Sequence, residues 1–275
     1  MQVTIQTDNP HQHEGAEQVV VGSPLPGMTE DEFAALARKI LVCVPYRSAE
    51  GVHPGICMHW GMWGRFGLRM ATIKDPHGGF IEIVRAGIVR TFLDYRKQVP
   101  EVEYLIMIDN DQGIEWDAPW RLARHALPVV TGVVCGYTEE KGIFACFTVK
   151  NPSGAAYFPT MKHTTIMPSE GVVEVHQCGT GLLCIHHSVL DQFAACNEIP
   201  FYIPEEIRRE SATTGDLRRS EDICFADLCE KYGIKRYADL SVQAVHYKNI
   251  GLAWPHDKLV SMPVAEWIVQ PHDGT

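Results

Sequence analysis

Short apolar runs alternate with amphipathic stretches along the middle of the chain. The run Tyr104–Asp109 has the length and apolar content of a buried strand, and Lys39–Pro45 is a similar run that ends at a proline. Between them, Phe80–Lys97 carries apolar residues at helical spacing, which predicts an amphipathic helix. The same reading predicts further strands over 69–73, 129–137, 143–149, 172–176, 182–185 and 235–246, and helices over 56–69, 117–127, 188–196 and 221–232. This alternation predicts an α/β fold with a mostly parallel sheet flanked by helices.

Polar and turn-forming residues mark the two ends of this ordered pattern. Prolines and glycines interrupt residues 1–36, which we expect to form a loosely structured leader; the alternative is an arm that covers a partner or a binding site. We expect residues 37–250 to form a single α/β domain and residues 251–275 to form a C-terminal extension.

Composition and charge narrow the class of protein. Of 275 residues, 45% are hydrophobic and 21% are charged, as is usual for a globular chain. No apolar run of about 18 residues predicts a membrane span, and the polar N-terminus lacks the pattern of a signal peptide. Nine cysteines without a CxxC pair favour a reducing, cytoplasmic setting. The formal charge of −10 argues against a dedicated nucleic-acid binder, although a local basic groove would reverse that judgement.

The first candidate for chemistry is Asp109-Asn110-Asp111, directly after the clearest predicted strand. Ligands of open α/β sheets bind beyond the carboxyl ends of the strands. Two carboxylates placed there can hold Mg²⁺ or Mn²⁺, which also takes phosphate oxygens. The alternative is an Asx-type turn with no ligand, which explains most such sequences.

Two later motifs add acidic and imidazole groups. Ser220-Glu221-Asp222 opens a predicted helix, where Ser220 is a suitable N-cap and the acids favour the helix dipole. A carboxylate held rigidly at this position can also act as a general base. His246 ends the last predicted strand, and a neutral imidazole there can ligate manganese or magnesium.

A small glycine-rich turn, Gly179-Thr180-Gly181, lies between two predicted strands. Glycine lets the backbone approach a ligand closely, whereas the simpler explanation is a plain turn.

The order of these motifs resembles that of GT-A glycosyltransferases. A first strand ending in proline, a central Asp-x-Asp, a glycine-rich turn, Glu-Asp on a helix and a late histidine follow one another over residues 38–250. The resemblance is closest to the family 2-like and mannan-polymerase-like enzymes, including small glycosyltransferases of bacteriophage genomes. It implies a GT-A (Rossmann-like) fold, a Mn²⁺ or Mg²⁺ cofactor, and a UDP- or GDP-sugar as the donor.

The resemblance also implies roles for single residues. Asp111 would be the principal metal ligand, His246 would complete the metal sphere, and Asp109 would hold the donor ribose or a water near the metal. Asp222 would be the catalytic base of an inverting enzyme, or would orient the acceptor in a retaining one, with Glu221 in support.

A further set of residues would contact the donor. The resemblance assigns to it Pro45, Tyr46 and Arg47 at the nucleotide base, together with Arg85, Asp109, Asn110, Gly179, Thr180 and Gly181. After Arg85 the sequence lacks an asparagine that related enzymes often carry, and no Gln-x-x-Arg-Trp follows Asp222, which disfavours a processive synthase.

Two other functions are alternatives to glycosyl transfer. One is nucleotidyl transfer to a sugar phosphate, which is weakened because the first strand is not followed by a glycine-rich basic loop. The other is a non-catalytic module that binds nucleotide or carbohydrate. The acceptor is equally open among a glycan, a protein and a modified nucleic-acid base, and a phage-encoded enzyme would work in the host cytoplasm.

Overall fold

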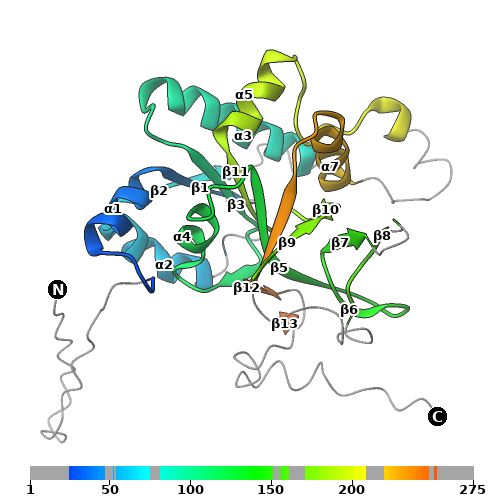
Figure 1. Cartoon of the computed structure of the whole chain (residues 1–275), viewed down its shortest axis with the longest axis horizontal. Coiled ribbons are helices and arrows are strands. Elements are labelled where there is room, and N and C mark those ends of the chain that lie inside the picture. The colour runs from blue at the N-terminus through cyan, green and yellow to red at the C-terminus, as the bar shows by residue number, and fades with distance from the viewer. Residues whose placement is uncertain are drawn as a thin grey trace, which may run out of the picture.

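A large mixed sheet forms the centre of the molecule (Figure 1). The computed structural model describes residues 25–46, 52, 54–74, 81–150, 154, 156–160, 171–208, 220–247 and 251–252. The strands of the main path are β1 (Ile40–Tyr46), β2 (Arg69–Lys74), β3 (Tyr104–Ile108), β5 (Val129–Thr138), β11 (Leu182–His186), β12 (Arg236–Tyr247) and β13 (Gly251–Leu252). Their order across the sheet is β13-β12-β5-β11-β3-β1-β2.

Most strands of this path point the same way. β1 pairs in parallel with β2 and β3, and β12 pairs in parallel with β5, whereas β11 and β13 run antiparallel to their neighbours. Shorter strands extend it: β4 (Gln112–Ile114) and β9 (Val172–Val175) pair with β12, and β6 (Gly142–Ala145) pairs with β5. A separate small sheet contains β7 (Phe147–Lys150), β8 (Ala156–Tyr157) and β10 (Gln177–Cys178). The predicted α/β fold with a mostly parallel sheet is therefore confirmed.

Helices cover both faces of the sheet and define two hydrophobic cores (Figure 1). One face carries α3 (Ile81–Gln98), α5 (His187–Ala195) and α7 (Glu221–Lys231), and the other carries α1 (Glu30–Arg38), α2 (Pro54–Arg65) and α4 (Ala118–Ala123). Side chains of β3 alternate between the cores: Leu105 and Met107 face the first, and Ile106 and Ile108 face the second. A strand buried on both faces needs a continuous apolar run, which is why β3 was the clearest strand of the sequence.

Helix α1 lies inside the predicted leader and corrects its boundary. Thr29 and Glu32 form a reciprocal capping box, in which the Glu32 carboxylate accepts from Thr29 N at 2.8 Å. Phe33 is fully buried and stacks on Trp120 with ring centroids 4.4 Å apart. The chain therefore joins the core from Leu25 onward, while residues 1–24 lie outside the described part.

The other end of the chain also differs from the predicted division. β13, the described part of the predicted C-terminal extension, pairs with the end of β12, where Leu252 lies opposite His246. Both differences have the same cause. Short segments flanked by polar residues become helix or strand because they pack on the core or pair with a neighbouring strand, and their hydrophobic pattern alone is too short to predict this.

Several element boundaries also needed correction. Helix α4 ends at Ala123, before the predicted Leu127, and Asp117 occupies its N-cap position without a capping hydrogen bond from its side chain. The predicted strand 143–149 is broken at Cys146, whose N–H donates to Val134 O at 2.8 Å, so β6 and β7 belong to different sheets. Among the helices that the structure describes, none has the length and apolar character needed to cross a membrane.

Candidate functional site

The turn Asp109–Asp111 follows β3 at the carboxyl edge of the sheet and is held by backbone hydrogen bonds. Asp109 N donates to Gly181 O at 2.9 Å, and Gln112 N donates back to Asp109 O at 3.1 Å. The chain then enters β4, a short strand that the sequence pattern did not predict. Backbone hydrogen bonds therefore hold the turn at both of its ends, without any contribution from side chains.

Strand β4 brings this turn to the end of β12. The two strands pair antiparallel with Gln112 opposite His246, and Tyr247 N donates to Asp111 O at 2.8 Å. Gly113 leaves room for the Tyr247 ring, because a Cβ there would lie 2.5 Å from one of its ring carbons. Residues far apart in the sequence, Asp111 and His246, thus become neighbours.

The Asp111 and His246 side chains meet directly. His246 Nε2 lies 3.1 Å from Asp111 Oδ2, and His246 Nδ1 lies 3.0 Å from the carbonyl oxygen of Cys135. Because a carbonyl only accepts, the second contact places a proton on Nδ1. Nε2 of a neutral ring then presents a lone pair to a carboxylate oxygen, and the contact needs a cation between them, either a second proton or a metal ion.

A second cluster lies at the same turn and centres on Arg85 of α3. Its Nη2 lies 2.8 Å and 3.0 Å from the two carboxylate oxygens of Asp109, and its Nη1 donates to Glu221 at the start of α7. The Arg85 side chain is 4% exposed, against 25% for Asp109 and 12% for Glu221. The guanidinium thus joins the ends of three elements in a largely buried ion-pair triad.

The two aspartates of the turn meet different partners. Both oxygens of Asp109 are within hydrogen-bonding distance of Arg85, which pairs this carboxylate with a cation that it shares with Glu221. Asp111 instead faces His246. Of the predicted metal ligands, the structure therefore brings Asp111 and His246 together and directs Asp109 to the arginine.

Asp222 lies one residue into α7, beside Glu221. Its Oδ1 accepts from Ile223 N at 2.9 Å and from the hydroxyl of Ser220. Ser220 has the extended backbone of an N-cap residue, but its side chain makes no capping bond to the helix. Ser220 therefore occupies the predicted N-cap position, but its hydroxyl donates to the Asp222 carboxylate and does not cap the helix.

The glycine-rich turn packs against protein atoms. A Cβ at position 179 would lie 2.9 Å from the carbonyl oxygen of Cys146, and one at position 181 would lie 3.2 Å from Gln112 Nε2. Thr180 between them is 3% exposed. Close packing of the protein is thus enough to explain both glycines, and their contact with a donor stays a prediction.

Gln112 is a residue at this site that the sequence analysis missed. Its side chain is 1% exposed, its Nε2 lies 3.5 Å from Asp111 Oδ1, and its Oε1 has no hydrogen-bond partner among the described residues. The available signal was a polar residue placed between an acidic turn and an apolar segment. Gln112 approaches Oδ1 of Asp111, whereas His246 contacts Oδ2 of the same carboxylate.

The remaining predicted donor residues lie around the same edge or outside the described part. Pro45 is buried near the end of β1, which runs parallel to β3, and Asn110 is half-buried in the turn. Tyr46 ends β1, but its side chain and all of Arg47 lie outside the described residues. Within the described ranges, no group of three or more His, Cys, Asp or Glu side chains is arranged to hold a metal.

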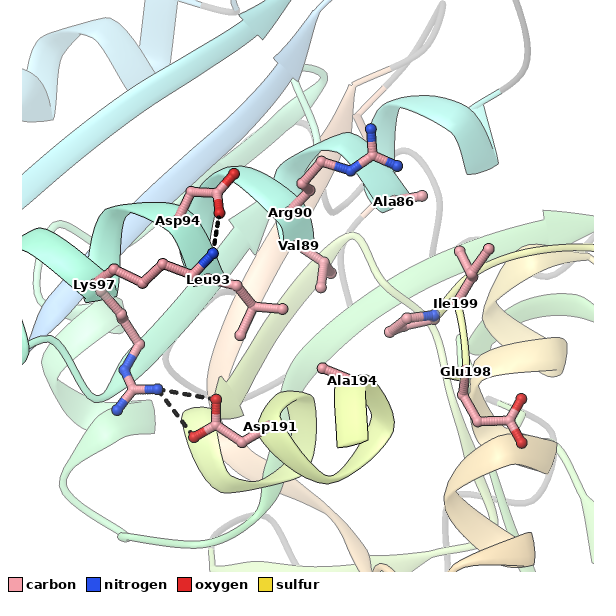
Figure 2. Close-up of a pocket in the computed structure, with 12 residues that line it drawn as sticks. Ala86, Val89, Arg90, Leu93, Asp94, Lys97, Asp191, Ala194, Glu198 and Ile199 are labelled. Atoms are coloured by element: carbon pink, nitrogen blue, oxygen red, sulfur yellow. Dashed lines mark hydrogen bonds and ion pairs between the residues drawn. The ribbon is translucent and has the colours of Figure 1, made fainter. Parts of the chain in front are cut away.

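A separate hollow lies between α3 and α5, with a volume of about 460 Å³ (Figure 2). Its lining mixes apolar side chains such as Val89 and Leu93 with paired charges, including Arg96 with Asp191 at 3.0 Å. None of the predicted site residues lines it. The hollow is therefore separate from the cluster formed by Asp109, Asp111 and His246.

Comparisons with known proteins give only distant likenesses. No protein-family model and no curated protein matches the chain. The solved structures that overlap with it include A197 from STIV, with 15% identity over 78% of this chain and 90% of the other and a TM-score of 0.47. They also include a glycosyltransferase involved in the glycosylation of the major capsid of PBCV-1 (11% identity, 65% of this chain, 77% of the other, TM-score 0.32) and GalNAc-T7 with UDP, GalNAc and Mn²⁺ (8% identity, 76% of this chain, 43% of the other, TM-score 0.41). At these identities and TM-scores, the overlaps establish neither an activity nor a ligand for this chain.

Proposed function

We propose that this chain is a metal-dependent glycosyltransferase that moves a sugar from a nucleotide-diphosphate sugar to an acceptor. The observation that carries the proposal is the contact of Asp111 with His246 at the carboxyl edge of the sheet. Such edges are where open α/β folds bind their ligands. A shared proton is enough to account for the contact, and an aspartate with an imidazole is also a suitable donor set for Mn²⁺ or Mg²⁺.

The small number of protein ligands fits a metal that is shared with a substrate. Mg²⁺ is commonly held by one or two carboxylates together with substrate phosphates and water. Asp111 and His246 would supply the protein side, and the donor diphosphate would supply the rest. When bound, the ion would neutralise charge on the departing nucleoside diphosphate.

Residues of α7 would act on the acceptor. In inverting transfer, Asp222 Oδ2 takes the proton of the acceptor hydroxyl. The hydroxyl oxygen then bonds to the anomeric carbon of the donor sugar, and the bond from that carbon to the nucleoside diphosphate breaks. Ser220 and Ile223 N hold Oδ1, which fixes the direction of the carboxylate. In retaining transfer, Asp222 orients the acceptor. Glu221 is bound to Arg85 and supports this position.

The test combines a panel of UDP- and GDP-sugars with Mn²⁺ and measures thermal unfolding and nucleotide release. A donor at 100 times its dissociation constant adds about 2.7 kcal/mol of stability. We expect Asp111→Asn and His246→Gln to lose the Mn²⁺-dependent part of both signals. His187→Gln is the matched control, because His187 also pairs with an aspartate, Asp191 at 2.7 Å, but on α5.

The outcomes separate the alternative functions. Donor binding without nucleotide release would favour a non-catalytic binding module, and release of pyrophosphate from a nucleoside triphosphate with a sugar phosphate would favour a nucleotidyltransferase. A Mn²⁺-dependent shift that survives Asp111→Asn unchanged would show that the metal assignment is wrong.

A further inference from the structure

The start of α7 and the acidic turn after β3 are joined by one side chain. Arg85 reaches from the first turns of α3 to Asp109 with Nη2 and to Glu221 with Nη1. Asp109 is two residues before Asp111, and Glu221 is next to Asp222. A single guanidinium therefore ties the segment that carries the proposed metal ligand to the segment that carries the proposed base.

Only arginine can make both of these ion pairs with the observed geometry. A guanidinium is a planar fork whose nitrogens donate in fixed directions, whereas a lysine ammonium is a single point of charge. Arg85 uses separate nitrogens for its two partners, with both oxygens of Asp109 on one of them. Lysine at this position would keep the positive charge and lose the geometry that fixes two carboxylates at once.

The burial of the triad makes it costly to break. Arg85 is 4% exposed, and two carboxylates share its one positive charge. Removing the guanidinium would leave two carboxylates close together in a poorly solvated place, where like charges repel and separate. The predicted movement is separation of the α7 start from the turn at 109–111.

We propose that Arg85 is a positioning residue: it sets the spacing between the acidic turn after β3 and the start of α7, and does not bind the donor itself. The expected effect of Arg85 on kcat rests on the proposed glycosyl transfer. The physical coupling of the two segments is independent of the reaction. It also differs from the donor contact that the sequence resemblance implied for Arg85.

The experiment compares Arg85→Lys and Arg85→Met with wild type in the full chain. The matched control is Glu82→Gln, in the same turn of α3, where Glu82 is equally buried and pairs with Arg208 at 2.8 Å. Hydrogen exchange measured by mass spectrometry should be faster at residues 109–112 and 220–224 in both arginine variants. Exchange over β1 and β5 should stay at the wild-type level in all of them, which shows that the fold is retained.

Kinetics of nucleotide release give the second readout. We expect kcat of Arg85→Lys to fall roughly 10–100-fold, as for other residues that orient a metal ligand, with a smaller change in the KM for the donor. Glu82→Gln should keep both constants. A raised KM with an unchanged kcat would show a direct donor contact and overturn the proposal, as would unchanged exchange at both segments. An inactive wild type would refute the glycosyl-transfer function, and the exchange result would still decide whether Arg85 couples the segments.

Discussion

Gly132 of β5 packs closely against β11 and β12, and Gly132→Ala is expected to destabilise the protein. A Cβ at this position would lie 2.6 Å from Leu182 Cδ2 and 3.0 Å from the carbonyl oxygen of Val242. Leu182 is fully buried, so its side chain has little room to turn away. Val242 belongs to a bulge in β12 between Asp239 and Gln243, and its oxygen moves only if the strand moves.

The magnitude follows from this crowding. Added atoms in a well-packed core usually cost about 1–3 kcal/mol, and the backbone contact places Gly132→Ala in the upper part of that range. Urea unfolding followed by circular dichroism measures the change in the free energy of unfolding. The bulge precedes His246 on the same strand, so the substitution also tests how rigidly the end of β12 is held.

Gly87→Ala in α3 is the matched control with the opposite sign. A Cβ there would meet no atom within 4 Å, and alanine in a helix interior is favoured over glycine by about 0.5–1 kcal/mol. We therefore expect Gly87→Ala to stabilise the protein. If Gly132→Ala leaves the free energy of unfolding unchanged while Gly87→Ala raises it, the packing argument for the β5–β11–β12 region is refuted.

Two more predictions concern buried titratable groups. Burial raises the pKa of Asp239, but hydrogen bonds from His125 and Ser241 outweigh this effect and leave the pKa lowered from 3.8. The ionised carboxylate therefore stabilises the protein above about pH 4, and this stabilisation is lost as the pH falls through the pKa of the folded state. In urea unfolding between pH 7 and pH 3, the free energy of unfolding should fall more steeply for wild type than for Asp239→Asn, and equal slopes would contradict this. Burial raises the pKa of Cys43 to about 12. In the native protein, iodoacetamide should therefore modify the exposed Cys57 and Cys196 and leave Cys43 unmodified, which peptide mass spectrometry would show. Early modification of Cys43 would contradict its burial.

Local pattern was enough to predict most elements and the fold class. The apolar run of β3, the helical spacing of α3 and the glycine after α7 are short-range signals, and Gly233 does adopt the left-handed conformation expected after that helix, with φ +67°. The prediction also located the acidic turn at the end of β3, because a strand buried on both faces must end where polar residues begin.

Tertiary structure decided which side chains meet. The pairing of β4 with β12 joins Asp111 to His246, and β4 is too short to leave a pattern in the sequence. Arg85 meets Asp109 and Glu221 because α3, β3 and α7 come together in space, which no sequence spacing encodes. Hydrophobic periodicity reports only which face of an element is buried. Strand pairing and ion pairs depend on groups distant in the chain, so only the folded structure assigns the partners of each acid.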